Sequence, residues 1–491
     1  MKTPLVLAVD IGSSSVKAGL FDAEARSLTG MEASARHAQT VASDGTSEEP
    51  VERIAGAVES CIDQVLDAAG DLAREIGGVG MDCMASTILG VDREGRAVTP
   101  VYTYADTRSA EDVERLKQEL DVPAVYDRTG VMQHTSYVPA RVRWLERTDP
   151  QRFERVQRWL DVSTFLFTCW FGDTDIAASY SVASWSGMLN RHELEWDAEL
   201  LGHLGLTPAN LPGLRSYTTP TSGLCDSFAD RWPALSDVPF FPAVGDGAAV
   251  NVGAGCVSAT RVALTVGTTS AMRVIVRGAP SPVPQGLWAY RLGRDASLFG
   301  GAFSEGGVLV EWAQRTLQLP PLAQLDGELS KLEPDGHGLT VLPFLAGERA
   351  TGWSTRATGV YEGIRVSTTP LEMLQAALEA VSLRFSLVAD LLLPEGRQDT
   401  RFIATGGAVR SSEWWLQAMA DSLGADVSVT GEAQETSRGA AVLALHGLGV
   451  WSGLDDFLPE IVKSYEPRPA MTSRYRRALD RQKSLYHRVL G

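Results

Sequence analysis

The sequence predicts an α/β protein of two related domains around a cleft, and three observations carry this prediction. Its 491 residues exceed the roughly 250–300 residues at which single cores stop growing. Strand-like apolar runs alternate with helix-like patterns along the whole chain. Finally, one strand–turn–strand unit occurs in each half: residues 11–15 (IGSSS) are echoed by residues 266–270 (VGTTS). We therefore expect both units to face one cleft.

The first half begins with a predicted hairpin of strands 5–11 and 16–21 around the turn 12–15. A helix follows from about residue 50, because apolar residues recur there at helical spacing. Two short strands are expected at 76–81 and 88–91, and helices at 111–120, 142–147 and 153–170. The Gly-, Pro- and Ser-rich stretch 171–260 contains the expected boundary, which divides the chain into domains 1–244 and 245–491.

The second half repeats a hairpin, with strands expected at 262–266 and 272–276, followed by a helix at 306–317. Pro370 suits the first turn of a long helix capped by Thr368 or Thr369. Its apolar stripe predicts a buried face. A strand at 401–405, a helix capped by Ser411 or Ser412 that runs to residue 423, and a last helix at about 436–446 complete the prediction.

Charge and cysteine usage exclude several classes of function. The chain has 44 Lys and Arg against 61 Asp and Glu, a net charge of −17, so broad binding to nucleic acid or an anionic membrane is not expected. No apolar run reaches the roughly 18 residues of a membrane span. The five cysteines are scattered without a CxxC pair, which indicates neither a zinc site nor a disulfide framework. We expect a cytoplasmic protein, because the first apolar run ends at Asp10, too early for a signal peptide.

The two small-residue turns are candidate phosphate loops. Backbone N–H groups in such turns form a concave anion site, and the hydroxyls of Ser13, Ser14, Thr268 and Thr269 would add donors. Each turn alone is better explained as an ordinary hairpin turn, so the hypothesis of phosphate binding depends on the pair of turns, with Asp10 directly before the first. Asp10 precedes the first turn, where a carboxylate beside phosphate requires a hard cation such as Mg²⁺. The alternative for Asp10 is an Asx-turn that only shapes the hairpin.

Asp246 is a candidate general base because Gly245 and Gly247 leave its carboxylate unshielded. A carboxylate that accepts a hydroxyl proton is the base that phosphoryl transfer needs. The alternative is a plain turn residue, since Asp-Gly is a common turn pair. The Gly406-Gly407 pair between a strand and a helix is typical of a nucleotide-binding turn, although neither GxGxxG nor a Walker motif occurs.

In this order, the motifs resemble those of the FGGY carbohydrate kinases, and the match runs nearly end to end. The corresponding segments are 9–17 (VDIGSSSVK), 104–108 (YADTR, with Tyr in place of the family's Trp), 245–247 (GDG), 264–269 (LTVGTT), 359–364 (GVYEGI) with Glu372 to Glu379, 405–408 (TGGA) and 439–441 (GAA). The resemblance implies two actin/Hsp70/hexokinase-like (ribonuclease H-like) domains around an interdomain cleft.

The resemblance also implies roles for individual residues. Asp246 would be the general base and would contact substrate, together with Met84 and Asp106. Asp10 would hold Mg²⁺, directly or through water. ATP would be the phosphoryl donor. Its expected contacts are Ser13, Ser14, Lys17, Gly267, Thr268, Gly307, Gly407 and Ser411. The partners implied are this nucleotide and a small sugar or sugar acid, with a homodimer left open.

The substrate is a further expectation. Segments 263–273 (ALTVGTTSAMR) and 342–349 (LPFLAGER) resemble the gluconokinase branch, so gluconate is the first expectation. Near Met84, however, both the gluconokinase and xylulokinase branches usually carry a Met-His pair, whereas here Ala85 follows and Asp82 lies close by. An Asp in the pocket would repel a carboxylate, so a xylulokinase-like ketose or polyol kinase is the alternative. Arg108 or Arg349 could supply a compensating charge. An actin/Hsp70-like ATPase without sugar phosphorylation is the second alternative, and a catalytically silent relative the third.

Overall fold

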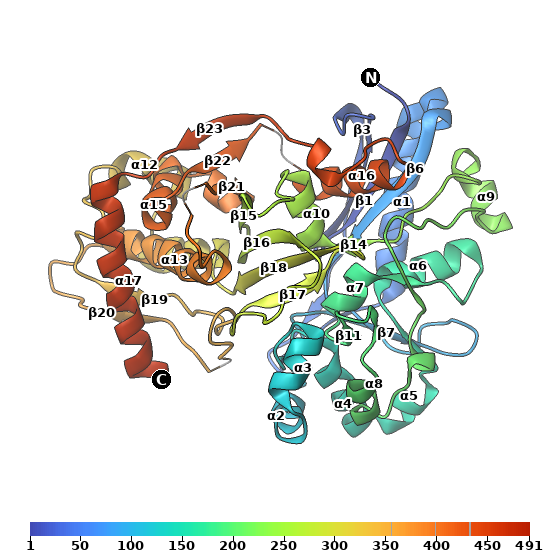
Figure 1. The fold of residues 1–491 in the computed structure, drawn as a ribbon, viewed down its shortest axis with the longest axis horizontal. Helices are drawn as coiled ribbons and strands as arrows, with labels where there is room; N and C mark the ends of the chain where they lie inside the picture. Colours follow the sequence, from blue (N-terminus) through green and yellow to red (C-terminus); the bar gives the residue numbers. More distant parts are fainter. Residues whose placement is uncertain (355, 398, 432–433) are drawn as a thin grey trace.

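Two mixed β-sheets organise the computed structural model, which describes residues 1–354, 356–397, 399–431 and 434–491 (Figure 1). The first sheet has the order β14 (Val244–Gly245), β6 (Ile76–Cys83), β1 (Leu5–Ile11), β2 (Ser15–Phe21) and β3 (Ser27–Arg36). The second has the order β17 (Trp288–Arg291), β18 (Ala296–Phe303), β16 (Ser270–Arg277), β15 (Arg261–Val266), β21 (Arg401–Thr405), β22 (Val427–Thr430) and β23 (Ile461–Tyr465).

The two sheets share one topology around their hairpins. In the first sheet β1 pairs antiparallel with β2 and parallel with β6, and β6 pairs parallel with β14. In the second, β15 pairs antiparallel with β16 and parallel with β21, which pairs parallel with β22. Both predicted hairpins are confirmed. The repeated small-residue motifs at 11–15 and 266–270 thus form equivalent turns in two sheets of the same topology.

Strand β1 is buried on both faces because helices cover each side. Leu5, Leu7 and Val9 pack with helix α1 (Val51–Ala69), whereas Val6 and Ala8 pack with helix α16 (Glu435–Gly447). Side chains alternate along a strand, so Asp10 shares the face of Val6 and Ala8, toward the second half of the chain.

Helices α10 (Asp246–Gly253) and α16 cross at very close range near the middle of the molecule (Figure 1). A Cβ added at Gly253 would overlap the carbonyl of Glu435, and one at Gly439 would overlap the carbonyl of Ala249. A Cβ at Gly80 on β6 would likewise overlap the carbonyl of Ala440. These glycines let the backbones touch, so residues 439–441, one of the segments that resemble the family, lie within a packed helix.

The predicted long helix is confirmed as α13 (Pro370–Leu392). Thr369 caps it through a hydrogen bond from the backbone N–H of Glu372, whose side chain in turn accepts from the backbone N–H of Thr369. Leu374, Leu378 and Val381 of its stripe are fully buried. Ser412, one of the two candidate caps, accepts from the backbone N–H of Trp415 at the start of α15 (Glu413–Leu423).

Two expectations about helices are wrong. Residues 153–170 do not form one helix, because α5 (Pro150–Arg155) ends before strand β9 (Arg158–Leu160), and α6 (Val162–Phe171) starts anew at the Asp161 cap. The helix expected last, now α16, is followed by α17 (Pro469–Leu490), which packs on α15 and α13 at one edge of the molecule (Figure 1).

Shorter elements complete the chain. The remaining helices are α2 (Ala110–Glu119), α3 (Val122–Thr129), α4 (Val138–Thr148), α7 (Tyr180–Trp185), α8 (Ala198–His203), α9 (Asp226–Arg231), α11 (Gly307–Leu317), α12 (Leu322–Leu329) and α14 (Gly407–Arg410). The remaining strands are β4 (Thr40–Val41), β5 (Ser47–Glu49), β7 (Leu89–Val91), β8 (Val101–Tyr102), β10 (Ala178–Ser179), β11 (Leu189–Asn190), β12 (Glu195–Trp196), β13 (Leu214–Arg215), β19 (Thr340–Leu342) and β20 (Val360–Glu362). Among the described residues, no helix has the length and apolar character to cross a membrane. The predicted boundary at 244/245 falls inside β14 and stays a prediction.

Candidate active site

A cavity of about 140 Å³ lies where the two hairpin turns meet. Ser13 of the first turn and Thr269 of the second line it, together with Asp246 at the start of α10. The sequence pattern predicted that two turns and one carboxylate would converge, and the structure places all three around one space.

The first turn is held from behind by His37. Gly12 N–H donates to the carbonyl of Ser15 at 3.1 Å, closing the turn. His37 Nε2 lies 2.9 Å from the carbonyl oxygen of Gly12, and its Nδ1 lies 2.7 Å from Glu49 Oε2, with both side chains fully buried. The imidazole thus links the backbone of the turn to a buried carboxylate. Ser13 and Ser14 remain exposed at the tip.

The second turn is fastened to helix α11. Gly267 N–H donates to the carbonyl of Thr269 at 3.0 Å. The carbonyls of Gly267 and Thr268 accept from the N–H groups of Gly307 at 2.7 Å and Val308 at 3.1 Å. Gly307, expected at the nucleotide, therefore lies beside the turn, but its own N–H is already engaged in holding that turn in place.

Three aspartates lie at the carboxyl ends of neighbouring parallel strands, two on the strands and Asp246 directly after one. Asp10 on β1 is in register with Asp82 on β6, and Asp82 is in register with Val244 on β14, two residues before Asp246. Carboxyl ends of parallel strands meet at one edge of a sheet, which is where α/β proteins bind ligands. These aspartates lie at the edge of the cleft that the first turn borders.

The electrostatics of these aspartates favour proton or cation binding. Burial raises the pKa of Asp10 to about 6, with Lys17 opposing the shift. Burial, reinforced by the charges of Asp10 and Asp246, raises the pKa of Asp82 well above its usual range. Among the described residues, no N–H donor binds the Asp10 carboxylate. Its oxygens therefore fit a hard divalent cation beside the phosphate turn.

Asp246 is oriented by the first turn of α10. Its Oδ1 accepts from the backbone N–H of Gly247 at 2.8 Å. Burial raises its pKa while the Arg273 guanidinium opposes that shift. Glycine is required on both sides of Asp246 for a packing reason that the sequence did not predict. A Cβ at Gly245 would overlap the indole nitrogen of Trp185, so the space they leave is filled by this side chain rather than left to substrate.

Two arginine side chains line the same cavity as Asp246. Arg273 Nη1 donates to Thr265 Oγ1 at 3.1 Å, but its buried Nε has no hydrogen-bond partner among the described residues. Burial lowers the pKa of Arg273 to about 10, with Asp246 opposing, so it stays charged at neutral pH. Arg349 lies over the ring of Tyr104, 5.9 Å from its centroid. Within the described residues Arg349 makes no hydrogen bond or ion pair through its side chain.

Aromatic side chains form the cavity wall, and these were not predicted. Tyr290 stacks on Trp185, with ring centroids 3.9 Å apart, and on Trp288 at 4.4 Å. Its hydroxyl lies 2.7 Å from that of Tyr137. Trp353 completes the wall. Apart from Trp288 and Tyr290, which share strand β17, they come from separate segments of both halves, so no single local pattern predicts the wall. An apolar wall with a few polar groups is typical of a small-molecule site.

Two residues expected at the substrate lie behind the cavity. Met84 is buried, and its neighbours Ala85 and Ser86 line the space instead. Asp106 is also buried and accepts from the backbone N–H of Ser47 and from the guanidinium of Arg108. The preceding Tyr104 supplies the cavity surface of this segment. Substrate contact by Met84 and Asp106 stays a prediction.

Asp82 and Arg108, which bore on the choice of substrate, are not among the residues lining the cavity. Asp82 faces Asp10, and Arg108 is paired with Asp106 and Glu48. The repulsion that Asp82 was expected to exert on a carboxylate substrate is therefore directed at the Asp10 site, and Arg349 rather than Arg108 offers the compensating charge.

Gly407 and Ser411, two of the expected ATP contacts, follow a glycine that packs against the second turn. A Cβ at Gly406, which has a positive φ of 89°, would lie 3.0 Å from the N–H of Gly267. Gly407 begins α14 and is exposed, as is Ser411 at its end. Ser411 Oγ donates to the carbonyl of Ala408 at 2.7 Å. Nucleotide contact by Gly407 and Ser411 stays a prediction.

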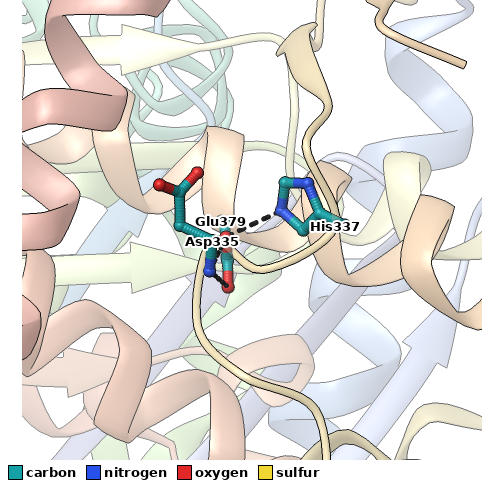
Figure 2. Close-up of side chains that lie close together, drawn as sticks. All are labelled: Asp335, His337 and Glu379. Carbon is teal, nitrogen blue, oxygen red and sulfur yellow. Dashed lines mark hydrogen bonds and ion pairs between the residues drawn. The ribbon is translucent and has the colours of Figure 1, made fainter.

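A second polar cluster, Asp335, His337 and Glu379, brings its possible metal-ligand atoms within 4.8 Å of one another (Figure 2). Its hydrogen bonds explain it without an ion. Glu379 accepts from His337 Nε2, the backbone N–H of Asp335 and the Tyr475 hydroxyl, each at 3.0–3.1 Å. His337 Nδ1 accepts from the N–H of Leu339, which fixes the proton on Nε2. The cluster ties α13 and α17 to the loop between α12 and β19.

Comparison with known proteins agrees with this arrangement. Residues 5–253 match the model of the FGGY family of carbohydrate kinases, N-terminal domain, and residues 262–448 match that of its C-terminal domain. A gluconokinase from Bacillus subtilis is 27% identical, over 95% of this chain and 92% of its own.

Solved structures show the same fold. A gluconate kinase from Lactobacillus acidophilus superposes with a TM-score of 0.91 at 23% identity, covering 99% of this chain and 98% of its own. A xylulose kinase from the same organism gives the same TM-score, identity and coverage. With both domain models matched in order around the cleft, the chain belongs to the FGGY family of carbohydrate kinases, which are phosphotransferases with an alcohol group as acceptor.

Proposed function

We propose that this kinase transfers the γ-phosphoryl group of ATP to a hydroxyl of a small sugar acid, with gluconate as the first candidate. One observation carries the choice of a sugar acid. Arg273 and Arg349 line the same cavity as Asp246, and Arg349 has no polar partner among the described residues. Guanidinium groups bind carboxylates through charge-assisted hydrogen bonds. The likeness to a gluconokinase at 27% identity supports the same candidate.

The proposed mechanism assigns a task to each group at the cavity. Arg349, with Arg273, orients the substrate carboxylate, so that the hydroxyl to be phosphorylated lies at Asp246. Asp246 accepts the hydroxyl proton, a role that its raised pKa favours. The turns at Ser13–Ser14 and Gly267–Thr268, with Lys17, hold the ATP phosphates, and Gly407 and Ser411 border the adenosine. When bound at Asp10, Mg²⁺ supplies charge neutralisation for the phosphate oxygens.

A neutral ketose such as xylulose is the second candidate. The observation that favours it is the electrostatic attraction between Arg273 and Asp246. If Arg273 serves Asp246, Arg349 alone is left to bind a substrate carboxylate. The aromatic wall of Trp185, Trp288 and Tyr290 also suits the apolar face of a neutral sugar.

We place the enzyme in the cytoplasm, because its five cysteines are all unpaired thiols.

A coupled assay of ADP release tests the choice of substrate. The panel is gluconate, xylulose, ribulose, ribitol, arabinitol, erythritol and glycerol. We expect kcat/KM for gluconate to exceed every other value at least tenfold, which corresponds to about 1.4 kcal/mol of discrimination in the transition state. A neutral sugar or polyol with the highest kcat/KM would instead support the second candidate. ATP hydrolysis that no sugar stimulates would contradict both.

A further inference from the structure

Asp82 is a buried acidic side chain that interacts with a second carboxyl group, that of Asp10. It is 0% exposed, and within the described part of the chain no N–H group or hydroxyl donates a hydrogen bond to either of its carboxylate oxygens. Burying an unpaired carboxylate is unfavourable by several kcal/mol, so natural proteins pair such groups or use them to coordinate metals. A buried polar group left without a partner in a native structure points to a function or to a bound ion.

The side chains around Asp82 make its negative charge still less favourable, because they are acidic as well. On one side lies Asp10 of β1, in direct register. On the other lies β14, which leads into Asp246. Lys17 of β2 is beyond Asp10, with which it is in register. Lys17 is exposed and its ammonium forms no ion pair with the described residues. Asp82 thus lies between two acids, and no cationic side chain among the described residues forms an ion pair with it.

Parallel strands in register point neighbouring side chains to the same face, so the carboxylates of Asp10 and Asp82 are presented together. Mg²⁺ and Mn²⁺ prefer carboxylate and water oxygens, which is the donor set offered. We propose that Asp82 is a second carboxylate ligand of the divalent cation bound at Asp10, and that these two aspartates hold the cation before nucleotide binds. The inference rests on the cation that the proposed function places at Asp10.

Mn²⁺ binding to the full-length protein without nucleotide or sugar tests this directly, because the paramagnetic resonance signal of free Mn²⁺ reports the bound fraction. The variants are Asp82→Asn and Asp82→Ser, which remove the charge at similar or smaller volume. Asp71→Asn is the matched control, since Asp71 has a side chain 97% exposed on the surface. We expect Asp82→Asn and Asp82→Ser each to weaken Mn²⁺ binding at least tenfold, and Asp71→Asn to leave it within twofold of the wild type.

Thermal unfolding with and without saturating MgCl₂ separates a metal ligand from a structural residue. Without metal, both Asp82 variants should unfold at the wild-type temperature or above it, because an unpaired buried charge has been removed. With MgCl₂, the wild-type midpoint should rise and that of the variants should rise less. A residue needed only for packing would lower the midpoint equally in both conditions.

The proposal is overturned if the wild type binds no Mn²⁺ in the absence of nucleotide, if both Asp82 variants bind it within twofold of the wild type, or if they are destabilised equally with and without MgCl₂. These measurements use no sugar and no phosphoryl transfer. A negative result would therefore leave the kinase proposal standing, and a failed substrate screen would leave the cation result standing.

Discussion

At the scale of single residues, Arg349 has the clearest expected effect on substrate choice. Replacing it with Met keeps the apolar stem and removes the guanidinium that faces the cavity. A hydrogen bond to a charged group contributes about 1.5–3 kcal/mol, so KM for gluconate should rise roughly 10- to 100-fold. Steady-state kinetics with gluconate and with glycerol as a neutral acceptor measure the effect. Glycerol kinetics should change much less.

A matched control for this variant is Arg294→Met. Arg294 is an exposed arginine that donates to the Tyr180 hydroxyl at 2.9 Å and does not line the cavity. It should leave both substrates unaffected. If Arg349→Met raises KM for gluconate and for glycerol equally, Arg349 does not bind the substrate carboxylate.

Glu305 predicts a dependence of stability on pH. It is buried with neither carboxylate oxygen hydrogen-bonded to the described residues, and burial raises its pKa from 4.5 to about 7. In this window the folded protein binds more protons than the unfolded chain, so stability falls as pH rises from 4.5 to about 7. The difference corresponds to at most roughly 3 kcal/mol.

Glu305→Gln removes this ionisation, so the variant should gain stability relative to the wild type as pH rises through the window. Urea unfolding below pH 4.5 and above pH 7 gives both free energies. Glu311→Gln, at an exposed position of α11, is the control and should shift nothing. A difference between Glu305→Gln and the wild type that stays constant with pH would contradict the burial of a titrating carboxyl.

At the scale of elements, the crossing of α10 and α16 depends on glycine. Gly439→Ala would place a Cβ against the backbone of Ala249, and such overpacking typically destabilises by 1–3 kcal/mol. Gly327→Ala in α12 has open space and should be neutral or stabilising by up to about 1 kcal/mol, because Ala favours helix. Chemical denaturation measures both changes. Equal stability of the two variants would show that the helices can separate without penalty.

The sequence predicted those elements whose signals are local. The hairpins 5–11 and 16–21, the α13 stripe and its Thr369 cap depend on near neighbours, and they were placed well. The stretch 153–170 was misread because Asp161 restarts a helix within an apolar run. Helix α17 was missed because most of its residues are polar or charged, although Tyr475, Leu479 and Gln482 form a buried stripe at helical spacing.

For the site, the sequence predicted the residues next to glycine turns and missed those brought in from a distance. Ser13, Asp246 and the second turn follow from short patterns. Trp185, Trp288 and Tyr290 meet only because β17 and α7 pack together across the two halves. The reason for Gly245, contact with Trp185, likewise needs tertiary structure.

At the scale of the whole molecule, two sheets of one topology place their equivalent turns on the same cavity, with Asp246 at the edge of the first sheet. In the proposed mechanism, both halves of the chain therefore contribute to holding the ATP phosphates and the substrate. Closure of such halves excludes water, so that a sugar hydroxyl rather than water takes the phosphoryl group.

Asp246→Asn tests this arrangement most directly. The substitution keeps the volume of the side chain and its hydrogen bond from Gly247 but removes the base. Formation of phosphorylated sugar should fall by roughly 10²–10⁴-fold, while ATP binding, measured by calorimetry, should stay near the wild-type value. A variant that phosphorylates the best substrate at nearly the wild-type rate would show that the carboxylate between the two turns is not the base, and would contradict the account.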